Sequence, residues 1–236
     1  WIRPQAEAEI AVAEELNEAP PRSVAIVLKD FEQEACFILL IWATGIIGIK
    51  ARQLSGQSHL VAINYFDLEP GVMILPGDTK HYVRNLQTLP EEQRDGLLPR
   101  MMLASLQRFG STGDIRSASE AARAMSEAEG ERLESELSMV RYIAWAIPSI
   151  GFIGTVRGIG DALSSADEAV KGNIAGVTES LGVAFNSTFV ALMLSIFLMF
   201  LLHQLQLRQD RHVLGADEFC ERDLLSRFKS FEESPN

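Results

Sequence analysis

The sequence has few of the residues on which metal sites, disulfide frameworks and nucleic-acid interfaces depend. It contains two cysteines, Cys36 in an apolar stretch and Cys220 in a charged one, and we expect both to be free thiols. Its four histidines show no metal-ligand spacing, and no credible Ser-His-Asp or Cys-His arrangement is present. The formal net charge of −11 argues against a nucleic-acid partner, which requires a basic face. We therefore expect no enzyme, no metal and no cofactor.

Long apolar segments are what the sequence does contain, and the charged residues lie between them. The mean hydropathy of the whole chain is only +0.08, an average that hides three apolar segments, at 31–50, 139–163 and 174–206. About 20 helical residues cross a bilayer, so the second and third segments are long enough. The fully apolar part of the first, 35–49, is shorter, which leaves a buried soluble helix as an alternative. The pattern predicts an all-α, polytopic membrane protein with three transmembrane helices.

The remaining segments complete the predicted layout. Residues 1–30 are acidic and partly helical, and residues 51–138 form a helical region with turns rich in glycine and proline. One continuous helix is expected from about 117 to 163, because its first part contains no strong helix breaker. It would span roughly 70 Å, more than twice the hydrocarbon core of a bilayer. Residues 164–173 form a short turn, and residues 207–236 form an amphipathic tail.

Basic residues next to the predicted transmembrane helices indicate the orientation of the chain. Six of them fall on one side of the membrane if the N-terminus is outside and the C-terminus is cytoplasmic: Lys50, Arg52, Arg132, Arg141, Arg208 and Arg211. Arg157 is an exception, near the outer end of the second helix. The region 51–138 and the tail are then cytoplasmic, the turn and the N-terminal segment are extracytoplasmic, and the second and third helices extend into the cytoplasm.

Small residues form a narrow stripe on the second transmembrane helix. They recur at every third or fourth position, as Gly151, Gly154, Gly158 and Ala162. A stripe of this kind lets helix backbones approach each other closely in lipid. Pro148, just before it, removes a backbone hydrogen bond and should kink the helix. We expect these residues, together with Ala184 on the third helix, to pack the helices against each other.

Four hydroxyl groups within the second and third apolar segments are candidates for an ion pathway. Thr155 lies beside the stripe of small residues, and Thr188 shares a face of the third helix with Ser195. Ser187, the neighbour of Thr188, completes the set. A threonine inside a helix can also hydrogen-bond the carbonyl four residues before it, so a packing role alone is the alternative.

A second polar set contains three charged residues and one amide: Arg157, Asp161, Glu179 and Asn186. Arg157 and Asp161 are four residues apart and point away from Thr155. Ionisable groups inside a membrane are costly and are usually paired, so we expect an ion pair between Arg157 and either Glu179 or Asp161. The alternative is that these groups lie at the level of the outer headgroups and reach water.

Two runs in this part of the chain resemble the MotA/TolQ/ExbB proton-channel family. They are PSIGFIGTVRGIGDAL at 148–163 and AFNSTFVAL at 184–192. The resemblance is close over about residues 135–205. The layout, with one helix, a large intervening region and then two helices, is nearer to TolQ and ExbB than to the four-span MotA.

The resemblance implies a non-enzymatic, pentameric subunit of an ion-driven motor or stator in the bacterial inner membrane. Family members surround a dimer of single-span partners of the ExbD/TolR/MotB type, each bearing a membrane aspartate. Thr155 and Thr188 would then form two polar rings facing that dimer. The process powered stays open between transport across an outer membrane, envelope maintenance, motility and phage defence. A non-conducting membrane scaffold that binds partner helices is the alternative.

The resemblance also bears on the transported ion. Many TolQ and ExbB members carry a glutamate five positions before the third-helix threonine, where this chain has Val183. More of the proton transfer would then fall on the aspartate of the partner protein. Hydroxyl groups alone hold Na⁺ poorly, which favours H⁺. Na⁺ is the alternative, because Thr155, Thr188 and Ser187 can join that aspartate in an all-oxygen shell, which hard cations prefer.

Overall fold

A computed structural model describes residues 30–60 and 72–229, and the regular structure in these residues is helical. Ile74 and Phe228 form an isolated bridge, but the described residues contain no strand. The predicted all-α class is therefore confirmed. The acidic N-terminal segment predicted to be partly helical lies outside the described residues, apart from Asp30. The described residues divide into two compact units, one made of 30–47 with 139–203 and the other made of 48–60 and 72–138 with 204–229.

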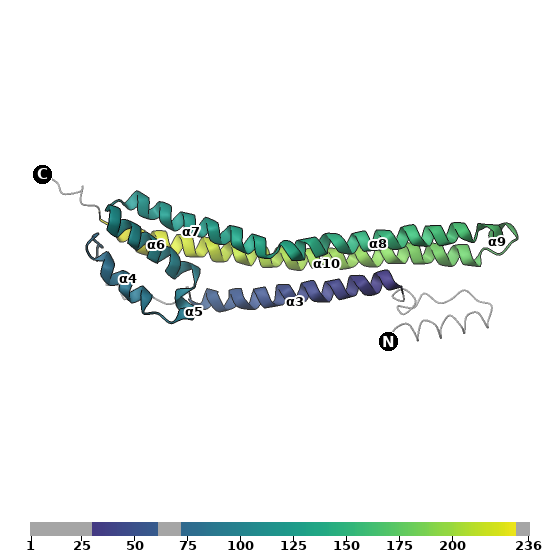
Figure 1. Ribbon diagram of the computed structural model, residues 1–236, viewed down its shortest axis with the longest axis horizontal. Coiled ribbons are helices and arrows are strands. Elements are labelled where there is room, and N and C mark those ends of the chain that lie inside the picture. Colours follow the sequence, from purple (N-terminus) through teal and green to yellow (C-terminus); the bar gives the residue numbers. More distant parts are fainter. Residues whose placement is uncertain (1–29, 61–71, 230–236) are drawn as a thin grey trace. The chain divides into compact units, whose positions relative to one another are not determined.

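The described part of the first unit contains parts of three long helices and a short helical connection. The N-terminal part of α3 (Phe31–Leu60) runs alongside α8 (Ser138–Ser164) and α10 (Ala175–Phe219), as Figure 1 shows. The short helix α9 (Ala166–Val170) joins α8 to α10, which run antiparallel. Gly172, in the turn after α9, has φ 97°, a conformation open to glycine because it has no Cβ.

Three helices in the described part of the chain are long and apolar enough to cross a membrane. Their candidate spans are Phe31–Gly56, Ile115–Ser164 and Ala175–Arg227. The last two contain 50 and 53 residues, about 75–80 Å of helix, so only their most apolar parts fit a hydrocarbon core of about 30 Å. Large apolar side chains such as Trp145 and Phe152 are exposed on α8, as a surface that faces lipid requires.

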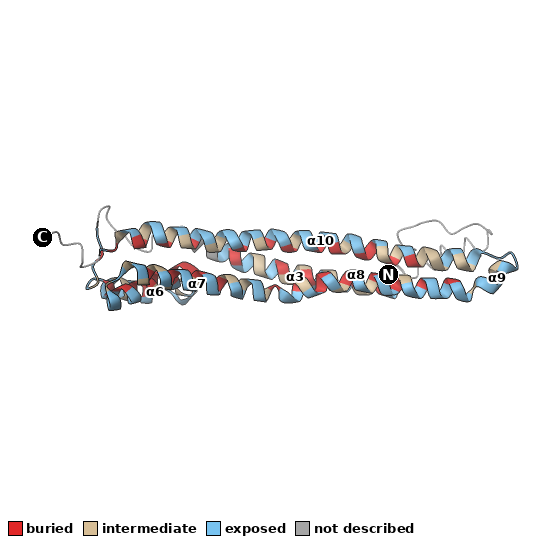
Figure 2. Ribbon diagram, turned by 90° about the horizontal axis from the view of Figure 1, so that it is seen from above, coloured by how far each residue is buried: buried red, intermediate tan, exposed pale blue. Residues whose placement is uncertain are grey.

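The contact between α8 and α10 follows one face of α8. Buried residues, which are red in Figure 2, follow the helical period along this face: Val140, Ile143, Ala144, Ile147, Gly151, Gly154, Gly158 and Ala162. Three of them are glycines that lie directly against α10. From Gly151 to Gly158 the antiparallel pair is thus held by close backbone packing, while larger side chains such as Ile143 and Ile147 fill the contact before it.

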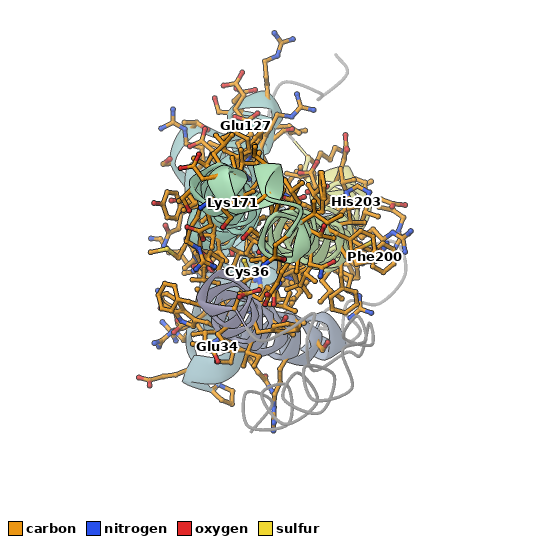
Figure 3. The ribbon with its side chains drawn as sticks, turned by 90° about the vertical axis from the view of Figure 1, so that its right-hand side faces the viewer. Glu34, Cys36, Glu127, Lys171, Phe200 and His203 are labelled. Atoms are coloured by element: carbon orange, nitrogen blue, oxygen red, sulfur yellow. The ribbon has the colours of Figure 1, made fainter. Side chains whose placement is uncertain are left out.

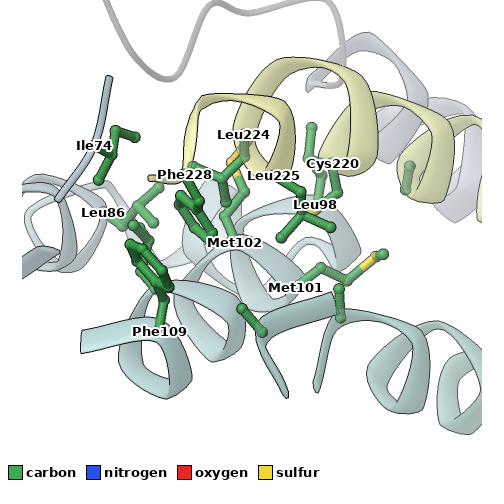
Figure 4. Packing of buried hydrophobic residues seen from close by; sticks show 14 of the residues in the cluster. Ile74, Leu86, Leu98, Met101, Met102, Phe109, Cys220, Leu224, Leu225 and Phe228 are labelled. Atoms are coloured by element: carbon green, nitrogen blue, oxygen red, sulfur yellow. The ribbon is translucent and has the colours of Figure 1, made fainter. Parts of the chain in front are cut away.

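The second unit is a small helical assembly with an apolar core. It contains α4 (Thr79–Gln87), α5 (Glu91–Arg94), α6 (Leu97–Thr112) and α7 (Ile115–Glu136), with the end of α10 followed by η1 (Cys220–Leu224) and η2 (Leu225–Arg227). Its core is drawn in Figure 4, where the rings of Phe109 and Phe228 stack with their centroids 4.2 Å apart. The Ile74 N–H donates to the Arg227 carbonyl at 2.8 Å, which ties the chain before α4 to the chain after α10.

The turn between α6 and α7 is built by two adjacent residues. Gly113 has φ 67° and ends α6 in the left-handed conformation that favours glycine. Asp114 then caps α7, because its carboxylate accepts from the Arg116 N–H at 3.2 Å and the Ser117 N–H at 2.9 Å. A hydrogen bond from the Ser117 hydroxyl, followed by the one from its N–H, holds the pKa of the Asp114 carboxyl below its usual value.

A chain of ion pairs connects three helices of the second unit. Glu129 on α7 is only 5% exposed and accepts from Arg132 at 2.5 and 3.0 Å and from Arg100 on α6 at 3.4 Å. Arg132 also donates to Glu136 at 3.0 Å, and Glu136 accepts from Lys50 on α3 at 2.6 Å. The buried carboxylate of Glu129 thus has two cationic partners, which offset the cost of removing it from water.

The helices differ from the sequence-based expectation at two places. The single helix predicted over 117–163 is divided into α7 and α8 at Leu137, whose N–H donates to the carbonyl of Glu134 three residues before it. That bond is of the tighter 3₁₀ type, and the Leu137 side chain is buried. The helix containing the third predicted span continues to Phe219, so the predicted amphipathic tail begins as part of α10.

Candidate functional site

Two threonines predicted from the sequence meet between the spanning helices of the hairpin. The hydroxyl of Thr155 on α8 is in hydrogen-bonding contact with the hydroxyl of Thr188 on α10. Each also has a backbone acceptor on the opposite helix. The Thr155 hydroxyl lies 3.1 Å from the Ala184 carbonyl oxygen, and the Thr188 hydroxyl lies 3.0 Å from that of Gly151. Both side chains are half-buried.

The hydrogens of this pair have more acceptors than they can use at one time. A hydroxyl group has one hydrogen and two acceptor lone pairs. Thr155 can therefore donate to Ala184 while Thr188 donates to Thr155, or Thr188 can donate to Gly151 while Thr155 donates to Thr188. Rotating the two hydroxyls converts one arrangement into the other, so the direction of the hydrogen bond between them can reverse.

The glycine stripe is what brings the two threonines together. A Cβ placed at Gly158 would lie 2.8 Å from the Ser180 carbonyl oxygen and 2.9 Å from the Ala184 nitrogen, closer than real side chains come. Gly151 and Gly154 face α10 in the same way, and Ala162 continues the buried face. Because no side chain separates the backbones here, hydroxyls on short threonine side chains can reach across.

Pro148 and Ser195 form a second, separate arrangement in the same hairpin. Pro148 lies inside α8 and has no N–H, so the carbonyl of Ala144, four residues before it, loses its helical donor. The hydroxyl of Ser195 on α10 donates to that carbonyl at 3.0 Å, in a buried position. Ser195 is one of the residues predicted to line an ion pathway, whereas its observed bond satisfies a backbone carbonyl that Pro148 leaves without a donor.

The partner of Arg157 differs from the one that the sequence predicted. Its guanidinium donates to the Glu32 carboxylate of α3 at 2.8 Å and lies 3.9 Å from that of Asp30, so the expectation of a pair with Asp161 or Glu179 was wrong. The charged set of the hairpin is therefore completed by the first helix. The reason is geometric, because α3 places its first turn beside this part of α8.

The other predicted residues take different positions. Asp161 and Glu179 are exposed, and Asn186 is half-buried. Ser187 is buried and donates to the Val183 carbonyl of its own helix at 2.9 Å.

Sequence reasoning missed the role of the first turn of α3. Viewed along the helices in Figure 3, Cys36 lies between α3 and the hairpin, and Glu34 lies on the other side of α3. Cys36 donates to the Ile147 carbonyl of α8 at 3.6 Å, while Glu32 and Gln33 are buried on the same side of α3. The signal that could have found this site is the polar run Glu-Gln-Glu at 32–34, inside an otherwise apolar segment.

These observations define a membrane protein whose spanning helices hold hydroxyl groups and an ion pair between them. The sequence model of the MotA/TolQ/ExbB proton channel family matches residues 93–218, more than half of the chain. The chain belongs to this family, which confirms the resemblance found over 135–205 and extends it toward the N-terminus as far as α5. Comparison with curated proteins found no match, and comparison with solved structures found none either.

Proposed function

We propose that this protein is the pentameric subunit of a proton-driven motor or stator complex. In this proposal five copies surround a dimer of single-span partners of the ExbD/TolR/MotB type, and proton flow past the aspartate of the partner produces mechanical work. The observation that supports it most directly is the pair of Thr155 and Thr188 hydroxyls inside the hairpin of a proton-channel family member. The chain contributes the pathway and the assembly, and it catalyses no covalent chemistry.

A single hairpin with one hydroxyl pair cannot conduct an ion, whereas a ring of such pairs can line a pore. Five copies would place ten hydroxyls around a central helix pair, each able to donate or accept a hydrogen bond. The exposed apolar residues of α10, among them Phe185, Phe189 and Leu192, supply a surface for neighbouring copies and for lipid. Such a ring is only weakly polar and suits a partner that carries its own ionisable group.

Protons fit the hydroxyl pair better than Na⁺ does. A sodium ion needs several oxygen ligands at the same time, and Thr155 and Thr188 are already engaged with each other and with backbone carbonyls. A proton needs only a hydrogen-bonded route and a titratable carrier. The reversible hydrogen bond between the two threonines provides such a route next to the carrier.

We place the protein in the inner membrane of a bacterium, with the N-terminus outside and the C-terminus in the cytoplasm. The first unit then lies largely within the bilayer, and the basic residues of the second unit lie on the cytoplasmic side. Reporter fusions at the C-terminus and in the α8–α10 turn would test this arrangement, since they should report opposite sides.

The experiment that tests the function is proton flux in liposomes. The full chain would be reconstituted with a single-span protein that bears a membrane aspartate and is encoded in the adjacent reading frame. Thr188→Val should slow the flux, because it removes the hydroxyl that Thr155 needs. Thr178→Val is the matched control, since Thr178 is an exposed threonine of the same helix that only bonds its own Ile174 carbonyl at 3.1 Å. Native mass spectrometry of the same sample reports the subunit count.

The possible outcomes separate the candidate functions. Flux that follows a pH gradient, is unaffected by sodium and falls in Thr188→Val but not in Thr178→Val supports the proposal. Flux that follows a sodium gradient at fixed pH, and is lost in Thr188→Val, overturns the proton assignment. A pentamer that binds the single-span protein but passes no ion supports the membrane scaffold instead.

A further inference from the structure

A carboxylate on the first helix lies at the same level of the hairpin as the threonine pair. Glu32 is 6% exposed and pairs with Arg157, which follows Thr155 by two residues, about 3 Å along the helix axis. Burying an ionisable group between spanning helices is costly, and such groups usually serve transport or relay roles. Glu32 lies outside the part of the chain that the family model matches, which begins at residue 93.

The side chain next to Glu32 has unmet hydrogen-bonding capacity. Gln33 is 1% exposed, and neither its amide oxygen nor its amide nitrogen has a partner in the described structure. Leaving a buried amide without partners is unfavourable, and a bound water molecule is the usual way in which proteins satisfy such a group. The amide can donate two hydrogen bonds and accept two more, so it can hold water beside the carboxylate.

The polar group on α10 that approaches Glu32 is adjacent to the threonine pair. A Cβ placed at Gly154 would lie 2.9 Å from the Ser187 hydroxyl oxygen and 3.4 Å from Cγ of Glu32, so both side chains border this glycine. Ser187 precedes Thr188 in the sequence, and Gly154 precedes Thr155. The two hairpin residues that border Glu32 each directly precede a member of the threonine pair in the sequence.

We propose that Glu32, Gln33, Ser187 and Arg157 form a hydrated proton-binding site beside the threonine pair. Glu32 takes a proton from a hydronium ion, which leaves one water molecule and a neutral carboxyl group. It returns that proton to water in a later step, so the carboxylate is regenerated and no other reactant is consumed. Arg157 keeps its charge throughout. The inference rests on the proposed function, to which it adds a second proton carrier from the chain itself.

The charges around Glu32 favour a proton over a metal cation. The Arg157 guanidinium at 2.8 Å repels a second cation, while a proton neutralises the carboxylate without needing space or further ligands. Asp30 lies 3.9 Å from the same guanidinium and can keep Arg157 paired when Glu32 is protonated. The Cys36 thiol also lies near Glu32 on α3, and on α10 the exposed Glu179 is about two turns from Ser187.

Infrared difference spectroscopy of the chain alone in lipid bilayers tests the site. Acidification protonates carboxyl groups throughout the chain, which has 32 Asp and Glu residues, so the band of Glu32 is the carbonyl component that the wild type shows and Glu32→Gln lacks. Exchange into heavy water should shift that component. Glu34→Gln is the matched control and should keep it, because Glu34 is an exposed residue on the same turn of α3. Identical difference spectra of the wild type and Glu32→Gln would overturn the inference.

A second variant tests the water and does not depend on keeping the ion pair. Gln33→Leu replaces an amide that lacks partners with an apolar group of similar size, so it should fold at least as well as the wild type. It should also slow the deuterium shift of the Glu32 band, because water no longer reaches the carboxyl group. An unchanged rate of exchange in Gln33→Leu would refute the hydrated site.

These results can be separated from those of the flux experiment. The infrared signal is measured without the partner protein, so it stands or falls independently of conduction. A band with no proton flux in the reconstituted complex means that the proposed function fails and the site survives. Proton flux with no band means that the site fails and the function survives. When both are present, Glu32→Gln should lower the flux below that of Glu34→Gln.

Discussion

Substituting Ser195 tests whether its hydroxyl replaces the backbone hydrogen bond that is missing at Pro148. Ser195→Ala leaves the Ala144 carbonyl buried with neither a hydroxyl donor nor a helical N–H. An unsatisfied buried group costs about 1–3 kcal/mol, while measured side-chain hydrogen bonds within membranes average about 0.6 kcal/mol and reach about 1.7. We expect Ser195→Ala to lower the free energy of unfolding by about 1–2 kcal/mol.

The same substitution should cost less when the proline is also replaced. In Pro148→Ala the new residue supplies an N–H to the Ala144 carbonyl, so removing the Ser195 hydroxyl no longer leaves that carbonyl unpaired. In this background we expect Ser195→Ala to cost about 0.5 kcal/mol or less. The coupling energy between the two sites would then be about 1 kcal/mol, within the range observed for residues that share a hydrogen-bonding group.

The assay is reversible unfolding of the four proteins of this cycle in detergent micelles, followed by helical circular dichroism. Ser149→Ala is the control, because the Ser149 hydroxyl donates to the Trp145 carbonyl at 3.0 Å, and Trp145 keeps the N–H of Ser149 as a helical donor. That variant should change stability by less than about 0.5 kcal/mol. An equal cost of Ser195→Ala with and without Pro148 would refute the reasoning, since the hydroxyl would then not replace the missing donor.

Three further substitutions test packing and electrostatics through unfolding measurements. Gly158→Ala should destabilise the protein by about 1–3 kcal/mol, because the new Cβ would meet backbone atoms of α10. In the control Gly160→Ala the new Cβ has open space, so this variant should stabilise the protein by up to about 1 kcal/mol. Equal effects of the two variants would contradict the close packing. Glu129→Gln should cost about 1–3 kcal/mol more than the exposed control Glu131→Gln, because it removes the buried negative charge that Arg132 and Arg100 contact. A smaller difference would contradict that role. The charged Asp114 carboxylate makes a small contribution to the stability of the folded protein, and its folded pKa is lower than the usual 3.8. That stabilisation is complete above pH 3.8 and is lost as the pH falls. Asp114→Asn should abolish this loss at low pH, and melting curves with the same acid dependence in both proteins would count against it.

The spanning helices and the hairpin could be predicted because their signals are local. Apolar length identified the three spans, and the turn between the second and third was marked by a short polar segment rich in small residues. The glycines at 151, 154 and 158 indicated a close helix contact through their spacing alone. Thr155 and Thr188 could be predicted because few hydroxyl groups lie beside such a contact in the apolar segments. Each of these inferences needs only the period of a helix and the properties of lipid.

The pairing of α3 with the hairpin could not be predicted, for a physical reason. A helix that is apolar on nearly all sides has no amphipathic face, so its sequence does not say which side turns toward its neighbours. Glu32 and Arg157 are 125 residues apart in the chain, and only the rotation of α3 about its axis brings them together. The break at Leu137 was missed for a related reason, since no glycine or proline marks it and a buried leucine fits a continuous helix equally well.

The four hydroxyls selected from the sequence can be separated by what their hydrogens do. Ser195 donates to a carbonyl that has no other donor, so its hydrogen is committed to the backbone. Ser187 also donates to its own helix, although its oxygen can still accept a hydrogen bond. Only Thr155 and Thr188 have alternative acceptors, and a group can relay a proton only if its hydrogen can change partner. The threonine pair is therefore the part of this set that suits ion transfer, and the ion pair of Arg157 with Glu32 begins two residues further along α8.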